Sequence, residues 1–146
     1  MATSQGVFPC YENQFKVNTS STSTASWATI ADCETFEVSF DNGVEEWTPF
    51  EQEGWMRRLM TSKALTITVT GKRNVGDTGN DFIAGLTFQN GRDAEADFQW
   101  TFPDGTVVQF NDAVISVTNN SGGDSTAVGA LEFEVMSNGA PTLPSA

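Results

Sequence analysis

Residues 34–70 read ETFEVSFDNGVEEWTPFEQEGWMRRLMTSKALTITVT and contain two alternating segments separated by a long insertion. In the first segment, ETFEVSF (34–40), the residues Phe36, Val38 and Phe40 fall on one face. In the second, ALTITVT (64–70), apolar residues alternate with threonine, which is itself a good strand former. Strict alternation of this kind is typical of β-strands with one buried face. The stretch therefore predicts two half-buried strands of an antiparallel sheet.

The same alternation recurs further along the chain. Residues 95–102 (EADFQWTF) and 130–136 (ALEFEVM) alternate strongly, and 106–110 (TVVQF) and 113–117 (AVISV) are predicted as two more strands. The Pro-Asp-Gly sequence at 103–105 supplies the turn of a hairpin. Six or seven such strands predict a mainly β fold, an antiparallel β-sandwich or barrel, in a single domain spanning residues 1–146.

One short flanking α-helix is expected beside the sheet. The residues at helical spacing are Phe82, Ile83 and Leu86. Asp77 or Thr78 can cap its N-terminus and Gly91 offers a stop, although DFIAGLTF can also be interpreted as a strand. The Ser/Thr-rich segment 18–29 is expected to form a mobile loop or arm. Asp41-Asn42-Gly43 fits either a turn or a bulge within a longer strand.

The composition argues against several classes of function. The chain has 146 residues, a net charge of −12 and no histidine, so the commonest general base and metal ligand is missing. The N-terminus lacks a signal-peptide pattern, and Cys10 and Cys33 are expected to be reduced thiols. Asp77 is better explained as a helix cap than as a Ca²⁺ ligand. No catalytic, cofactor-binding, metal or membrane-spanning site is predicted.

Paired acids leave a hydrolase open as one alternative. A glycosidase needs two carboxyl groups at a set separation, and residues i and i+2 of a strand face the same way. A strongly acidic protein nevertheless carries many such pairs on its solvated face. The candidate groups are Glu45/Glu46, Glu51/Glu53, Asp93/Glu95/Asp97 and Glu132/Glu134.

The insertion at about 41–63 is too long for an ordinary hairpin connection. It combines aromatic residues, methionine and arginine, the types enriched in the cores of protein interfaces, and five of the seven basic residues fall within 57–73. These features predict a surface for self-association. Its candidate residues are Trp47, Phe50, Glu51, Glu53, Trp55, Met56, Arg57, Arg58, Met60, Lys63, Lys72 and Arg73. The alternative is that EGWMRRLM folds back as a helical turn into the domain's own core.

Three segments together resemble the tail tube (major tail) proteins of tailed bacteriophages. They are VSFDNGVEEWTPFEQEGWMRRLMTSKALTITVTGKRNVGDTGNDFIAGL (38–86), NGRDAEADFQWTFPDGTVVQF (90–110) and LEFEVMSNG (131–139), and the similarity covers about residues 6–139. The resemblance implies a two-sheet β-sandwich with a helix at about 80–90. It also implies a stacking loop at about 41–63 and extended arms at about 1–17 and 137–146.

The resemblance further implies a structural virion protein rather than an enzyme. Its subunits would form hexameric rings that stack into a hollow tube, assembled in the bacterial host cytoplasm, through which DNA passes without specific binding. Expected partners are further copies of the chain, a tape-measure protein, and tail terminator and distal tail proteins, with no membrane insertion. An acidic surface suits this role, because basic groups on the channel wall would bind phosphates. The alternative is a monomeric Ig-like or carbohydrate-binding β-sandwich that uses Trp27, Trp47 or Trp55 as a stacking platform.

Overall fold

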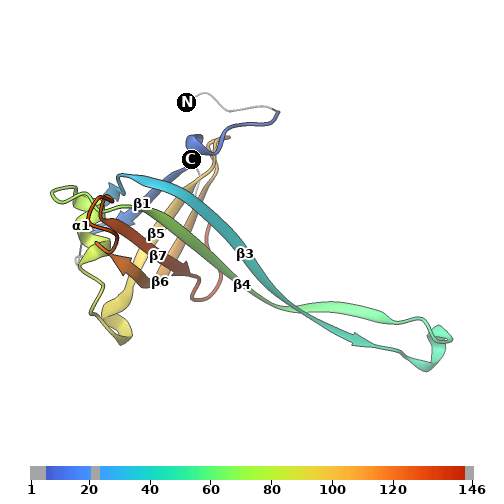
Figure 1. Ribbon diagram of the computed structural model, residues 1–146. Helices are drawn as coiled ribbons and strands as arrows, with labels where there is room; N and C mark the ends of the chain where they lie inside the picture. Colours follow the sequence, from blue (N-terminus) through green and yellow to red (C-terminus); the bar gives the residue numbers. More distant parts are fainter. Residues whose placement is uncertain (1–5, 21–23, 144–146) are drawn as a thin grey trace.

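The computed structural model describes residues 6–20 and 24–143, which form one seven-stranded antiparallel sheet and one short α-helix, α1 (Figure 1). The predicted mainly β, antiparallel class is confirmed. The order of strands across the sheet is β2-β1-β5-β6-β7-β4-β3. The elements are β1 (Gln14–Asn18), β2 (Trp27–Thr29), β3 (Cys33–Trp47), β4 (Arg57–Lys72), α1 (Thr78–Ala84), β5 (Glu95–Thr101), β6 (Val107–Asn120) and β7 (Ala130–Met136), with 3₁₀ turns η1 (Cys10–Glu12), η2 (Phe50–Gln52) and η3 (Gly91–Ala94).

The sheet folds over so that its two halves face each other. Strands β1 and β3 are well separated in the strand order, yet the rings of Phe15 and Phe36 contact each other with centroids 5.0 Å apart. Phe36 also meets Trp100 of β5, at 5.8 Å. The sandwich-like body is therefore built from one folded sheet, rather than from the two sheets that the resemblance implied.

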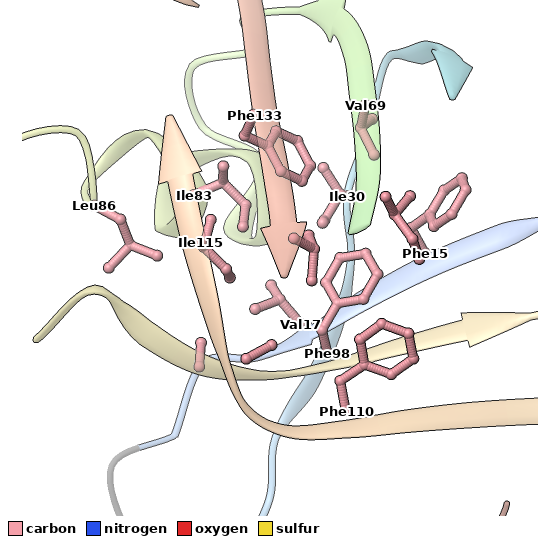
Figure 2. Packing of buried hydrophobic residues seen from close by; sticks show 14 of the residues in the cluster. Phe15, Val17, Ile30, Val69, Ile83, Leu86, Phe98, Phe110, Ile115 and Phe133 are labelled. Carbon is pink, nitrogen blue, oxygen red and sulfur yellow. The ribbon is translucent and has the colours of Figure 1, made fainter. Parts of the chain in front are cut away.

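A bend in β6 allows the sheet to fold. The first part of β6 pairs with β5 and the second part with β7, and Val114 takes part in both pairings. Asp112 has a positive φ of 55°, and its N–H donates to Asp97 Oδ1 at 3.0 Å, which fixes a bulge. Figure 2 shows the strand turning sharply between Phe110 and Ile115. The two strands predicted at 106–110 and 113–117 are thus a single bent strand.

The core fills the space between the two halves of the sheet. Figure 2 shows Phe15, Phe98 and Phe110 from one half and Phe133 from the other meeting in this space. The inward residues of the predicted alternating segments are buried as expected, among them Ile67, Val69, Leu131 and Val135. Phe36, Val38, Trp100 and Phe102 are only partly buried against this cluster, and Phe40 is exposed, because it lies where β3 leaves the body. Burial of this continuous apolar cluster is the main stabilising contribution to the fold.

Helix α1 is shorter than predicted. The side chain of Asp77 caps it by accepting a hydrogen bond from the N–H of Asn80 at 2.9 Å, so the proposed N-cap is confirmed. The helix ends at Ala84, and Gly85 rather than Gly91 forms its C-cap. The prediction of a helix at 80–90 is therefore wrong at both boundaries, and the strand interpretation of DFIAGLTF is also wrong. Ile83 and Leu86 are nevertheless buried against the core.

The terminal segments are more firmly attached to the body than predicted. Residues 14–17, expected in an N-terminal arm at 1–17, belong to β1, and β2 lies within the expected mobile segment at 18–29. At the other end, Thr142 exchanges two backbone hydrogen bonds of 2.8 Å with Gln109. The segment expected as an extended arm at 137–146 is therefore attached to the body as far as Thr142. Residues 1–5, 21–23 and 144–146 lie outside the described residues. Within the described ranges, no helix has the length and apolar character needed to cross a membrane.

Candidate assembly interface

The insertion is a projecting β-hairpin rather than a loop. Strands β3 and β4 remain paired to the Trp47–Arg57 rung, so only residues 48–56 connect them. β7 pairs with β4 no further than Thr66, so the hairpin continues beyond the body as two strands alone (Figure 1). We call residues 41–64 the arm and residues 48–56 its tip. The paired part of the arm is roughly 20 Å long, at about 3.4 Å per residue. The segment expected to be a loop at 41–63 is therefore a paired hairpin, with only residues 48–56 connecting its strands.

A β-bulge sets the pairing along the arm. The register shifts between Gly43 and Val44, and Thr61 is skipped in the pairing, so Met60 lies opposite Val44. The DNG sequence therefore lies beside a bulge and not in a turn. The shift also places Arg58 opposite Glu46, to which it donates a hydrogen bond.

The same shift aligns Arg57 with Trp47. The guanidinium carbon of Arg57 lies over the indole ring at 5.8 Å from its centroid, a distance that allows a cation–π interaction. This contact and the Arg58–Glu46 pair are both solvent-exposed, so each stabilises the arm only slightly.

The tip is a structured turn. Its N–H groups bond back to carbonyls within it: Gln52 to Pro49 at 3.2 Å and Trp55 to Gln52 at 3.0 Å. Glu53 takes a left-handed conformation with φ of 52°, and Gly54 follows with φ of 93°. These positive φ values reverse the chain after η2. The tip consequently holds its side chains in a defined arrangement away from the body.

None of the side chains of the arm is buried in its own subunit. Phe50 is fully exposed, Trp55 is 77% exposed, and Trp47, Met56 and Met60 are exposed as well. The alternative in which EGWMRRLM packs into the domain's own core is therefore wrong. A two-stranded hairpin is marginally stable by itself in water, and apolar side chains gathered on a surface mark a binding site. The arm thus presents exposed apolar side chains of the kind found at binding surfaces.

The structure separates the predicted interface residues into two groups. Ten of the twelve lie on the arm: Trp47, Phe50, Glu51, Glu53, Trp55, Met56, Arg57, Arg58, Met60 and Lys63. Lys72 and Arg73 lie at the other end of β4, roughly 45 Å from Arg58 along an extended strand at about 3.3 Å per residue. There Lys72 pairs with Glu34 and Arg73 with Asp81. The basic window at 57–73 does not form one patch.

Sequence reasoning missed other exposed apolar residues of the arm. Val44 and Leu59 are both exposed. On a two-stranded arm both faces meet solvent, so the polar–apolar alternation that identifies a half-buried strand is absent here. The signal that could have found them is the apolar content of the insertion itself.

The cysteines are unpaired, and Cys33 is held as a neutral thiol. Burial raises the pKa of Cys33 to about 12, and the nearby charges of Asp32 and Asp77 act in the same direction. Its Sγ donates to the carbonyl of Ile30. A thiol of this kind is a poor nucleophile at neutral pH. Among the described residues, no group of three or more Cys, Asp or Glu is arranged to hold a metal ion.

The tryptophans proposed as a stacking platform lie on different parts of the molecule. Trp27 is in β2, at the edge of the body, whereas Trp47 and Trp55 belong to the arm. Each of these rings would therefore have to act as a separate platform for a sugar.

No known protein-family profile matches the sequence, and no curated protein shows significant similarity to it. Solved structures do match. A chain in the tail of an empty gene transfer agent (GTA) particle with C6 symmetry superposes with a TM-score of 0.72 at 21% identity, over 95% of this chain and 100% of that one. A chain from the virion of the native GTA particle gives 0.71 at 21% identity, with the same coverage of 95% and 100%.

A third match comes from an extracellular contractile injection system, in the structure of the PVC sheath/tube terminator in its extended state. Its TM-score is 0.61 at 12% identity, over 97% of this chain and 99% of that one. This protein has the fold of these tail proteins. The tail fold extends over nearly the whole chain, so the arm and the body both belong to the shared architecture.

Proposed function

We propose that this protein is the subunit of a tail tube, in which hexameric rings stack into a hollow cylinder that conducts DNA. The observation that carries the proposal is the arm, which exposes aromatic and methionine side chains on a two-stranded hairpin with no covering from its own subunit. The tail fold supports the same role, since one matching chain belongs to a tail with C6 symmetry.

The free edge of β3 supports the formation of rings. β3 is the last strand in the sheet order, so its outer edge pairs with no strand in the described chain. A long unpaired edge is a template for pairing with another chain, and closing such edges around a ring removes them. The first edge strand, β2, is short and differs in sequence from β3. A contact between unlike edges is heterologous, and a heterologous contact can close into a ring.

One face of the sheet suits the wall of a DNA channel. The residues of β4 that alternate with buried Ile67 and Val69 point away from the core, and neighbouring strands add the residues opposite them. These residues form two rows that cross β3, β4, β7 and β6 in that order. The rows are Glu37–Thr68–Glu134–Ser116 and Thr35–Thr70–Glu132–Asn119. Neither row contains lysine or arginine, and Lys72, the next outward residue of β4 on this face, is paired with Glu34. A surface of hydroxyl, amide and carboxylate groups does not hold phosphates, so DNA would slide past it.

The proposal places the protein in the tail of a virion, with a structural rather than a catalytic role. Its main partners are further copies of itself. The other partners are a tape-measure protein inside the tube, and terminator and distal tail proteins at the ends of the tube. Assembly takes place in the bacterial host cytoplasm.

Negative-stain imaging of the purified chain at rising concentration tests this proposal. We expect rings and tubes for the wild type, and folded but unassembled subunits for Trp55→Ala combined with Arg57→Glu. Two results would overturn the proposal: a wild-type protein that stays monomeric at high concentration and binds glycans, or tubes whose channel is lined with lysine and arginine. Normal tubes from the double variant would show that the arm does not form the contact between subunits.

A further inference from the structure

We propose that a pocket beside the turn between β5 and β6 binds an organic cation, namely a small amine with an alkylammonium group. The pocket has a volume of about 310 Å³, at the lower end of the range for small-ligand sites. Its side chains come from Phe8, Asn13, Trp100, Phe102, Pro103 and Asp104. The inference does not depend on the proposed function, because the pocket lies within a single subunit.

Two segments that are far apart in the sequence form the walls of the pocket. Residues 6–13 supply one wall, and residues 100–104, at the end of β5 and in the turn that follows, supply the other. Figure 1 shows the blue N-terminal segment beside the turn that joins β5 to β6. The indole N–H of Trp100 donates to Asn13 Oδ1 at 2.9 Å, and this hydrogen bond ties the two walls together.

The core of the protein holds the aromatic rings of the pocket in place. The ring centroid of Trp100 lies 4.4 Å from that of Phe102 and 5.8 Å from that of Phe36, which in turn contacts Phe15. Trp100 and Phe102 are only partly buried against the core, so part of each ring remains open to the pocket. Phe8, on the other wall, is 47% exposed. Aromatic rings gathered in this way attract a cation through their π faces.

Asp104 adds a fixed negative charge at the rim of the pocket. Its Oδ1 accepts a hydrogen bond from the N–H of Thr106 at 2.9 Å, and the N–H of Phe102 donates to the Thr106 carbonyl at 2.7 Å, which closes the turn. The hydrogen bonds from Thr106 lower the pKa of the Asp104 carboxyl below its usual value of 3.8, so the group is ionised at neutral pH. Because a carboxylate can accept about four hydrogen bonds, capacity remains for a ligand.

The hydrogen-bonding groups of the pocket favour a cation over a sugar. The indole N–H of Trp100 is engaged with Asn13, and the side-chain amide of Asn13 donates to the carbonyl of Cys10 at 3.0 Å. The strongest polar group left for a ligand is the Asp104 carboxylate, which only accepts. A sugar hydroxyl both donates and accepts, whereas an alkylammonium group only donates and is itself charged. An amine therefore matches the pocket in charge and in hydrogen bonding.

A free amine suits the pocket better than a basic side chain of a second copy. The chain has 7 lysine and arginine residues against 19 aspartate and glutamate residues. Four of the seven already contact a partner in their own subunit, namely Arg57, Arg58, Lys72 and Arg73. A molecule with a net charge of −12 also attracts cations from the surrounding solution.

Titration calorimetry of the unassembled chain with butylammonium tests the proposal. The neutral compound 1-butanol has the same carbon chain and shows what the charge contributes, and sodium chloride keeps the ionic strength constant. Asp104→Asn removes the charge but keeps an oxygen that can accept from Thr106, and Phe8→Ala removes an aromatic ring. Both side chains are exposed, so both variants should fold, which urea unfolding checks.

Asp124→Asn is the matched control. It makes the same change of charge in the exposed loop that follows β6, whereas the pocket lies beside the turn that precedes this strand. We expect butylammonium to bind the wild type with a Kd of about 1 mM, and 1-butanol to bind at least about tenfold more weakly. Asp104→Asn and Phe8→Ala should each weaken butylammonium binding by at least about fivefold, and Asp124→Asn by less than about twofold.

Three results would overturn the proposal: no measurable binding of butylammonium, equal binding of butylammonium and 1-butanol, or equal weakening by Asp104→Asn and Asp124→Asn. The last result would show that only the net charge of the protein attracts the amine. If the isolated chain binds butylammonium but assembled tubes do not, a basic side chain of a neighbouring copy occupies the pocket in place of a free amine. None of these results bears on the tail-tube role, which imaging tests separately.

Discussion

Asn80 shows how much one side chain can organise in a small β protein. Its side chain makes four hydrogen bonds, three to residues 72–74 and one to Ala31, and it is the buried polar residue of the described chain. Removing a buried partner leaves the remaining groups unsatisfied, which costs far more than the hydrogen bonds contribute on average. We expect Asn80→Ala to lower the free energy of unfolding by about 3 kcal/mol, measured by urea denaturation. Asn138→Ala, which removes one exposed hydrogen bond, is the control and should cost less than about 1 kcal/mol.

The carboxyl group of Asp81, which accepts a hydrogen bond from Arg73, makes the free energy of unfolding depend on pH. A hydrogen bond from Arg73 lowers the pKa of the Asp81 carboxyl below its usual value of 3.8, and a second from the N–H of Gly76 adds to this. Because the pKa is lowered in the folded state, its contribution is present above 3.8 and is lost as the pH falls through the folded-state pKa. We expect Asp81→Asn to unfold at lower urea than the wild type at pH 7, and the difference to shrink in strong acid. If the difference in urea stability between the variant and the wild type stayed the same from pH 7 to strong acid, this role of the Asp81 carboxylate would be contradicted.

Single residues could be predicted from the sequence where their partners are local. The cap at Asp77 is recognisable because its partner, the N–H of Asn80, is three residues away. The role of Asn80 was not predictable, because its amide bonds to Ala31, far away in the sequence. Only the folded sheet brings these segments together.

At the scale of elements, the arm should be separable from the body. No residue from 41 to 64 is buried, so the arm contributes little to the core. Gly43 and Ser62 are paired, so an Asn-Gly turn can replace residues 44–61. We expect this shortened chain to unfold within about 1 kcal/mol of the wild type, and to form no stacks at any concentration in electron micrographs. A shortened chain that does not fold would show that the arm is required for the body.

Strands with one buried face were predictable, and strands without one were not. The segments at 34–40, 64–70 and 130–136 lie in strands, and so does 95–102 apart from Phe102, because burial imposes alternation on them. In the arm both faces are exposed, so the same two strands continue without that pattern and look like a loop. The bend of β6 was missed for a related reason: Asn111 and Asp112 look like a turn between two strands, but they form a bulge within one.

At the scale of the whole molecule, like charges oppose assembly. Each subunit carries a net charge of −12, so bringing copies together costs electrostatic energy that salt screens. The screening length falls from about 30 Å at 0.01 M salt to about 8 Å at 0.15 M. We expect the threshold concentration for tube formation, measured by sedimentation, to fall as salt rises across this range. A threshold that rises with salt would instead show that complementary ion pairs dominate assembly.

The division of the basic window is also a property of the whole molecule. In sequence, Arg57 to Arg73 appears to be one cluster. In the structure, a single extended strand carries its two ends to opposite ends of the subunit. A count of charges therefore predicted one attachment site, whereas the length of β4 places these residues at two separate ends of the subunit.

The continuity of β4 from arm to body has a mechanical consequence. A pull on the tip enters the body along a strand that is hydrogen-bonded to β3 on one side and to β7 on the other. Force along the strand direction loads these bonds in shear, so many of them must break together before the subunit unravels. A filament built through such strands resists stretching within its subunits, and under tension it separates at the contacts between them.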